Sequence, residues 1–283
     1  MAAGRSAPIG VFDSGVGGLT VLRALQAELA NEHFVYLGDT ARLPYGTKSP
    51  DTVARYGLQA AHALIERGVK ALIIACNTAS AIALPAMAQR YRDVPLIGVV
   101  HPGADAAVAA TRSGHIAVIA TEATVRGGAY QRAILARRPE ARITAVPCQL
   151  FVALAEEGWT EGPIVRAVAE RYLADLFGAQ ARTRADHADT LVLGCTHFPM
   201  LRSTIRAVIG EQVAIVDSAA TTAASAHALL RERGLVDGEP PDAGTPALRL
   251  LATDGAERFA AIGSRFLGRS IGAEEVEIID LYL

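Results

Sequence analysis

The chain has 283 residues, of which 51% are hydrophobic and 20% charged, and its formal net charge is −2. This length predicts about two domains and a core large enough to fold without disulfides or metals. The nearly balanced charge provides no whole-chain attraction for nucleic acid or for an anionic membrane surface, so neither is expected as a partner.

The three cysteines, at positions 76, 148 and 195, are widely spaced and form no CxxC pair for zinc or redox chemistry. The N-terminal residues contain no apolar signal-peptide segment. No apolar window approaches the roughly 18 residues that are needed to cross a bilayer. These features predict a protein of the reducing cytoplasm, without a metal site.

Short apolar segments alternate along the chain with helical stretches such as residues 20–29, 51–66 and 164–177. The apolar segments are nearly continuous in character, as parallel strands buried on both faces must be. The predicted strands are residues 9–12, 34–37, 71–75, 96–100, 116–120, 143–146, 190–193, 213–216, 248–252 and 276–279. Such alternation predicts an α/β fold, and this number of strands fits two mainly parallel sheets better than one.

A change of lobe is expected near residues 101–103, whose His-Pro-Gly sequence favours a break, with a return near Val213. The first lobe would comprise residues 1–99 and 214–283 and would carry Cys76, and the second would comprise residues 100–213 and carry Cys195. Residues 237–246 are rich in Pro, Gly and Asp, which predicts a surface loop.

Two segments of similar form, ALIIACNTAS (71–80) and TLVLGCTHFP (190–199), each place a cysteine directly after an apolar strand. In an open parallel sheet, ligands bind outside the carboxyl ends of the strands, so both cysteines would face a site. The helix that begins after each cysteine offers free N–H groups and the positive end of its dipole, which lower a thiol pKa. Cys148 lacks this setting and is expected to be a packed core residue.

The alternative for Cys76 or Cys195 is also a structural role, because cysteine is among the residues most often buried. Two cysteines at equivalent strand ends favour chemistry instead. Redox pairs usually lie close in sequence, and acyl transfer needs only one cysteine and a histidine base. Stereoinversion at carbon needs a base on one face and an acid on the other, which one thiolate and one thiol can supply.

Two glycine-containing turns follow the first two predicted strands. Asp13 and Ser14 lie in DSGVGG, whose spacing fits neither a dinucleotide-binding loop nor a Walker loop. Asp13 is expected to orient an ammonium group or to tune Cys76, and helix capping is the alternative. In the PYG turn, the amides or the hydroxyl of Tyr45 would meet a carboxylate, although an ordinary turn explains this motif by itself.

The second half of the chain offers further polar candidates. Thr121 and Thr124 follow a predicted strand and would either cap a helix or bind substrate. His197, two residues after Cys195, would donate a hydrogen bond or a proton unless it is a structural histidine. Glu156 is expected to assist His197, and a solvated helix charge is the alternative.

Taken together, these motifs resemble those of the bacterial glutamate racemases. They occur in the family's order and extend over most of the chain. The resemblance rests on GVFDSGVGGLTV (10–21), GDTARLPYG (38–46), ACNTASA (75–81), PGA (102–104), LFVALAEEG (150–158) and LGCTHFPML (193–201). It implies a pseudosymmetric two-lobed enzyme with its active site between the lobes. Such an enzyme interconverts L- and D-glutamate without PLP or metal and supplies D-glutamate for peptidoglycan.

The resemblance also implies roles for individual residues. Cys76 would act on D-glutamate and Cys195 on L-glutamate, and Asp13 and His197 would assist the two thiols, with Glu156 supporting His197. The residues implied to contact substrate are Asp13, Ser14, Tyr45, Gly46, Asn77, Thr78, Thr121, Thr196 and His197. The chain departs from the family pattern at Gln149 and Ala153, where prolines are common.

Three other functions remain open at this point. An aspartate racemase of the same superfamily also uses two cysteine turns, although the DSGVGG and PYG motifs favour glutamate. A thiol hydrolase would use only Cys195 and His197. A non-catalytic amino-acid-binding protein would share the two lobes, but the absence of an export signal argues against a periplasmic form. A homodimer is expected from base rates alone.

Overall fold

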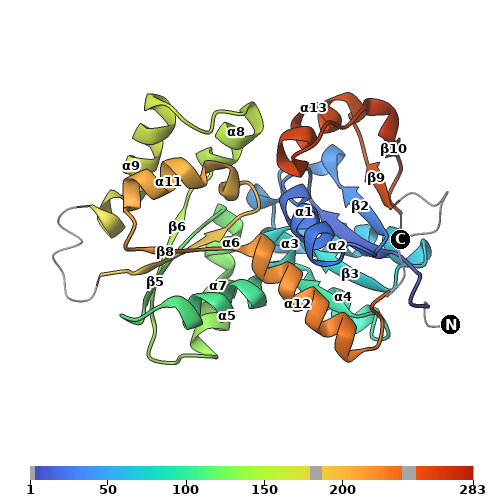
Figure 1. The fold of residues 1–283 in the computed structure, drawn as a ribbon, viewed down its shortest axis with the longest axis horizontal. Coiled ribbons are helices and arrows are strands. Elements are labelled where there is room, and N and C mark those ends of the chain that lie inside the picture. Colours follow the sequence, from blue (N-terminus) through green and yellow to red (C-terminus); the bar gives the residue numbers. More distant parts are fainter. Residues whose placement is uncertain (1–3, 179–186, 238–246, 283) are drawn as a thin grey trace.

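The computed structural model describes residues 4–178, 187–237 and 247–282. The predicted loop 237–246 lies, apart from Asp237, outside the described residues. Within the described ranges, no helix combines the length and apolar character that a membrane crossing requires. The predicted α/β class is confirmed, because two parallel sheets, each flanked by helices, form two lobes that lie side by side (Figure 1).

The first lobe is built on a six-stranded parallel sheet with the order β10-β9-β2-β1-β3-β4. Its strands are β1 (Ile9–Asp13), β2 (Phe34–Gly38), β3 (Ala71–Ile74), β4 (Leu96–Gly98), β9 (Leu248–Ala252) and β10 (Val276–Ile278). The central strands β1, β2 and β3 are buried at every position, which explains why their sequences are apolar without alternation.

Helices cover both faces of this sheet and bury its apolar side chains. One face packs against α1 (Leu19–Glu28), α12 (Ser218–Glu232) and α13 (Ala256–Leu267). The other packs against α2 (Pro50–Glu66), α3 (Asn77–Ile82) and α4 (Leu84–Arg90). Three 3-10 turns complete the lobe: η1 (Thr40–Arg42), η2 (Tyr45–Thr47) and η4 (Ala273–Glu275).

The second lobe is built on a four-stranded parallel sheet with the order β6-β5-β7-β8. Its strands are β5 (His115–Ala120), β6 (Arg142–Pro147), β7 (Thr190–Gly194) and β8 (Ala214–Asp217). One face packs against α8 (Leu150–Glu157), α9 (Pro163–Phe177), η3 (Phe198–Leu201) and α11 (Arg202–Ile209). The other packs against α5 (Val100–Ala110) and α7 (Ala129–Leu135), and α6 (Glu122–Gly127) follows β5.

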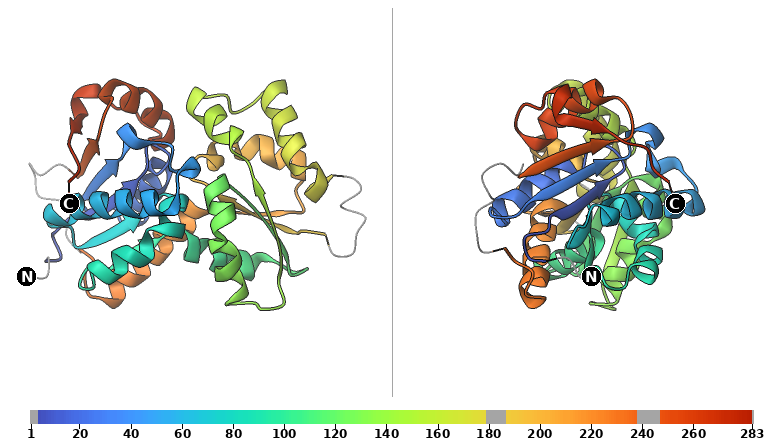
Figure 2. Two further views of the ribbon diagram at one scale, coloured as in Figure 1. Left: turned by 180° about the vertical axis from the view of Figure 1, so that it is seen from behind. Right: turned by 90° about the vertical axis from the view of Figure 1, so that its right-hand side faces the viewer.

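The chain crosses between the lobes twice. The first crossing lies between β4 and α5, so the expected break at residues 101–103 falls inside α5. The second leads into α12, which packs against α1 of the first lobe and α5 of the second (Figures 1 and 2). The predicted boundary at residues 213 and 214 is wrong for β8, because this strand pairs with β7 in the second sheet. The other limits of the lobes stay a prediction.

The carboxyl ends of the central strands in both sheets point toward the junction of the lobes (Figure 1). Five turns therefore meet there: residues 13–18 after β1, 39–46 after β2, 76–78 after β3, 121–124 after β5 and 195–197 after β7. This convergence is the one that the sequence predicted for open parallel sheets.

Candidate active site

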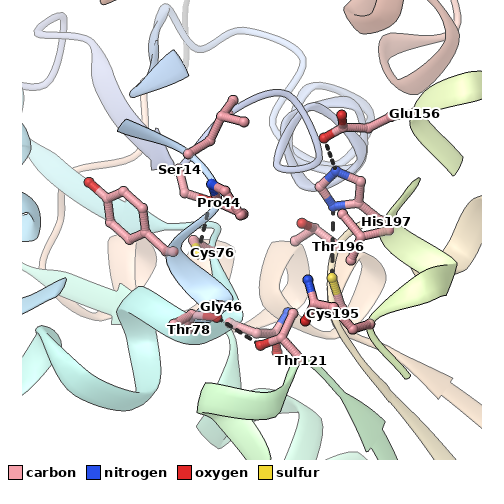
Figure 3. Close-up of a pocket in the computed structure, with 16 residues that line it drawn as sticks. Ser14, Pro44, Gly46, Cys76, Thr78, Thr121, Glu156, Cys195, Thr196 and His197 are labelled. Atoms are coloured by element: carbon pink, nitrogen blue, oxygen red, sulfur yellow. Dashed lines mark hydrogen bonds and ion pairs between the residues drawn. The ribbon is translucent and has the colours of Figure 1, made fainter. Parts of the chain in front are cut away.

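A pocket lies at the junction of the lobes, with an empty volume of about 500 Å³ that includes its open mouth. It is lined by Ser14, Gly15, Leu43, Pro44, Tyr45, Gly46, Cys76, Asn77, Thr78, Thr121, Gln149, Val152, Glu156, Cys195, Thr196 and His197. Cys76 and Cys195 lie on opposite sides of it (Figure 3). Every site residue expected from the sequence lines this pocket, with the exceptions of Asp13 and Thr124.

Cys76 comes from the first lobe, at the end of β3, and serves as the N-cap of α3. Its sulfur accepts a hydrogen bond from the N–H of Ala79 at 3.4 Å and lies 3.4 Å from Oγ of Ser14. Burial and the charge of Asp13 nevertheless outweigh these contacts and raise the pKa of the Cys76 thiol to about 12. The start of α3 therefore lowers the pKa of Cys76 through the Ala79 N–H, as predicted, but this effect is smaller than that of burial.

Asp13 lies behind this thiol and is 1% exposed. Its carboxylate accepts hydrogen bonds from the N–H of Gly15 at 3.0 Å and from the hydroxyl of Tyr36 at 3.3 Å. A Cβ at Gly18 would lie 2.6 Å from Cβ of Asp13, so only glycine fits beside it. Asp13 therefore influences the pocket through its charge on Cys76.

Cys195 comes from the second lobe, at the end of β7, and heads a chain of polar contacts (Figure 3). Its sulfur lies 3.7 Å from Nδ1 of His197, and Nε2 of the same ring lies 3.2 Å from Oε1 of Glu156. The other carboxylate oxygen of Glu156 accepts a hydrogen bond from Arg258 of α13 at 3.3 Å. Glu156 is thus paired with His197 and is not the solvated helix charge that was the alternative.

The protonation of this chain follows from its contacts. Burial by itself would lower the pKa of His197, but its hydrogen bonds with Cys195 and Glu156 outweigh burial and raise the pKa to about 10. The hydrogen bond from His197 holds the pKa of Glu156 below its ordinary value, against the opposing effect of burial. At neutral pH, His197 is therefore a cation whose Nδ1 lies beside the Cys195 sulfur.

The glycine-rich turn after β1 allows the second lobe to approach closely. A Cβ at Gly17 would lie 2.5 Å from Oγ1 of Thr196 and would overlap Nδ1 of His197. Thr20, on α1, donates its hydroxyl to the carbonyl oxygen of Thr196 at 3.2 Å. This glycine-rich turn thus serves as a contact surface between the lobes.

The position of Tyr45 does not agree with one of its predicted roles, in which its hydroxyl meets a ligand carboxylate. Its hydroxyl donates to Oδ2 of Asp39 at 2.5 Å, and the residue is 1% exposed. Burial, followed by the charge of Asp39, raises the pKa of this phenol. The hydroxyl is therefore already engaged, which leaves the backbone of the turn for a ligand. Gly46 packs against Thr121 of the other lobe, since a Cβ there would lie 2.9 Å from Cβ of Thr121.

Three threonine hydroxyls form a closed ring of hydrogen bonds across the junction. Thr78 of the first lobe lies 3.0 Å from Thr121 and 3.2 Å from Thr124, and the last two lie 3.0 Å apart. Thr78 and Thr121 line the pocket, whereas Thr124 supports them from behind. Each hydroxyl can donate or accept, so the ring can reorient toward an anionic ligand.

Gly15, Leu43 and Pro44 line the pocket beside predicted residues of the two glycine-containing turns. Gln149 and Val152 also line the pocket and were not predicted as site residues. They share one side of α8 with Glu156, because residues three and seven positions apart lie on the same helix face. This helical spacing relative to Glu156 is the sequence feature from which Gln149 and Val152 could have been predicted. Oε1 of Gln149 is buried and has no hydrogen-bond partner in the described part of the chain.

Two remaining expectations from the sequence concern metal binding and Cys148. Among the described residues, no group of three or more His, Cys, Asp or Glu side chains is arranged to hold a metal ion. Cys148 is fully buried in the core of the second lobe and does not line the pocket, as expected of a packed residue.

Comparison with known proteins relates this site to a family. The model of the Asp/Glu/Hydantoin racemase family matches residues 9–226. The glutamate racemase of Geobacter metallireducens is 47% identical over 93% of this chain and 94% of its own length. That of Neisseria meningitidis serogroup A is 44% identical over 98% of both chains.

Solved structures agree with these sequence matches. The glutamate racemase of Francisella tularensis, in complex with D-glutamate, superimposes with a TM-score of 0.86 at 36% identity over 98% of both chains. That of Thermus thermophilus, in complex with β-chloro-D-alanine, gives 0.84 at 41% identity over 98% of both chains. An aspartate racemase homologue from Pyrococcus horikoshii is only 14% identical and shares the fold alone. The chain belongs to the Asp/Glu/Hydantoin racemase family, and within it to the glutamate racemases.

Proposed function

We propose that the protein interconverts L- and D-glutamate by moving the Cα proton between Cys76 and Cys195. One observation carries this proposal: two buried thiols, each at the end of a strand in a different lobe, face one pocket from opposite sides. Inversion at Cα requires removal of a proton from one face and delivery to the other. Relatives named glutamate racemase, at 42% to 47% identity, support glutamate as the substrate.

In the L-to-D direction, the Cys195 thiolate removes the Cα proton and becomes a thiol. The Cys76 thiol then donates its proton to the opposite face of the carbanion and becomes a thiolate. The reverse direction exchanges the two roles. The cationic His197 beside Cys195 and the raised pKa of Cys76 support a free enzyme with the proton on Cys76. This enzyme form is ready to act on L-glutamate.

Substrate binding is proposed to use the polar groups around the two sulfurs. Hydroxyls of Ser14, Thr78, Thr121 and Thr196 and the amide of Asn77 line the pocket and can bind carboxylate or ammonium groups. Asp13 and His197 assist the thiols on their own sides, and Glu156 keeps His197 protonated. The backbone of Tyr45 and Gly46 completes the wall for the side-chain carboxylate.

The proposed reaction needs no PLP or metal, because the residues named above supply both the acid and the base. We further propose that the enzyme acts in the cytoplasm, where its D-glutamate enters peptidoglycan synthesis, and that it forms a homodimer, as is common among soluble enzymes. These last points rest on the resemblance and on base rates. Light scattering of the purified protein would measure the assembly directly.

The deciding experiment is a chirality assay with L-glutamate and L-aspartate at equal concentrations, using protein freed of PLP and metal ions. We expect the circular dichroism signal of glutamate to decay to zero and that of aspartate to persist. Preferential decay of the aspartate signal would instead identify an aspartate racemase. An absolute requirement for PLP would contradict the two-thiol reaction.

A further inference from the structure

A tyrosine outside the pocket lining holds one of the pocket residues. Tyr130 lies on α7 of the second lobe and is fully buried. Its hydroxyl donates a hydrogen bond of 2.7 Å to Oδ1 of Asn77, the first residue of α3 in the first lobe. Nothing in the motifs drew attention to Tyr130, because it belongs to no strand-end turn.

This hydrogen bond leaves the other end of the Asn77 amide without a partner. Asn77 is 3% exposed and lines the pocket, and its Nδ2 is buried without a hydrogen bond to any described residue. A buried donor of this kind is unusual in a folded protein, and one in a pocket wall is satisfied when a ligand supplies the acceptor. The missing partner is therefore an acceptor on the substrate.

The position of Asn77 next to Cys76 indicates which acceptor this is. The Cys76 sulfur must reach Cα of the substrate, and the α-carboxylate is bonded to that carbon. An amide can present either its oxygen or its NH₂ group, and only the NH₂ group suits a carboxylate. A contact that fixes the orientation of the amide would therefore favour substrate binding.

The ring of Tyr130 is packed tightly enough to fix the orientation of this amide. A Cβ at Gly103 of α5 would lie 3.2 Å from the Tyr130 hydroxyl, and one at Gly194 of β7 would lie 3.1 Å from its ring. Because both residues are glycines, the backbone of α5 and of β7 packs directly against the ring. Burial raises the pKa of this phenol, so its hydroxyl keeps its proton at any ordinary pH.

We infer that Tyr130 is a positioning residue that holds the Asn77 carboxamide with its NH₂ group toward the α-carboxylate of the substrate. This inference rests on the proposed glutamate racemase function and adds a second-lobe residue to it. The contact also joins the lobes, because α7 and α3 belong to different ones. Substrate binding on the Cys76 side is thereby coupled to the docking of the second lobe.

The test replaces Tyr130 by Phe, which keeps the ring and removes only the hydroxyl. We expect KM for both enantiomers of glutamate to rise about tenfold and kcat to change less than about threefold, because a contact made equally in the ground and transition states affects KM. Tyr91→Phe is the matched control. The Tyr91 hydroxyl is also buried, but among the described residues it has no hydrogen-bond partner, and it does not line the pocket. The KM of this variant should therefore equal that of the parent.

A second pair of variants separates positioning from general loss of structure. If Tyr130 acts through Asn77, adding Tyr130→Phe to Asn77→Ala should leave KM within about twofold of that of Asn77→Ala alone. Should Asn77→Ala be too slow to assay, titration calorimetry with L-glutamate gives the same comparison as dissociation constants.

An unchanged KM in Tyr130→Phe, or a further tenfold rise in the Asn77→Ala background, would overturn the inference. Failure of the parent protein to racemise glutamate would instead overturn the proposed function. The two failures are therefore distinguishable in one set of assays.

Discussion

The carboxylate of Glu156 holds Nε2 of His197 at 3.2 Å, and this contact lies between the two lobes, where α8 meets α13. Because its Nε2 is held, the imidazole directs Nδ1 toward Cys195. The ring of Phe266 on α13 packs edge-on against the same imidazole, with centroids 5.1 Å apart. His197 is therefore oriented by residues of both lobes.

Replacement of Glu156 and of Arg258 should have effects of very different size. Glu156→Gln removes the charge that keeps His197 protonated, and kcat/KM should fall about 10- to 100-fold, as expected for loss of a charged hydrogen bond. Arg258 is 67% exposed, so its ion pair with Glu156 is screened by solvent and Arg258→Gln should lower kcat/KM less than about threefold. Steady-state kinetics of the two variants, at one pH and salt concentration, make this comparison. Equal losses would contradict the ranking.

Titration of His197 should determine how the free energy of unfolding and kcat/KM change with pH. Its pKa is raised in the folded protein to about 10 from the ordinary histidine value of 6.5, so its stabilising contribution is complete below pH 6.5 and is lost as the pH rises through 10. The free energy of unfolding, measured by denaturant titration, should fall over this range more steeply in the parent than in His197→Asn. The basic limb of kcat/KM should lie near pH 10 in the parent and should be absent in the variant.

The two single variants Cys76→Ser and Cys195→Ser should each reduce racemisation by at least about a thousandfold, because each removes one of the two proton-transfer groups. Each should retain loss of HCl from one enantiomer of 3-chloroglutamate, since elimination needs only the base on one face. We expect Cys195→Ser to retain elimination of the D-isomer and Cys76→Ser that of the L-isomer. Racemisation at the parent rate by either variant would rule out the two-base mechanism.

Gly17→Ala tests the contact between the lobes. A Cβ at this position overlaps His197 and Thr196 in the present arrangement, so the lobes or the imidazole must move. We expect stability to fall by about 1–3 kcal/mol, as in other overpacked sites, and kcat/KM to fall more than tenfold. Gly127→Ala, where a Cβ meets nothing within 4 Å, is the control and should behave as the parent. Thermal unfolding and the racemase assay report both quantities.

The fold was largely predictable because it depends on local patterns. Strands buried on both faces must be apolar at successive positions, and the ten predicted segments coincide with the ten described strands to within a few residues. The sheet in which a strand pairs is not a local property, and for this reason residues 214–217 were assigned to the wrong lobe. Asp13 was expected in the pocket, but the depth of a side chain behind its neighbours depends on packing from other elements.

What the sequence alone determined was the chemistry at the strand ends: two thiols in matching turns, with an imidazole two residues after the second. This followed because the carboxyl ends of parallel strands meet at one edge, whatever the details of packing. Only the tertiary structure decided how each group is used. Burial beside Asp13 raises the pKa of the Cys76 thiol, and the hydroxyl of Tyr45 is engaged by Asp39. The orientation of Asn77 depends on Tyr130, 53 residues away in sequence, because hydrogen bonds and desolvation depend on distances in space.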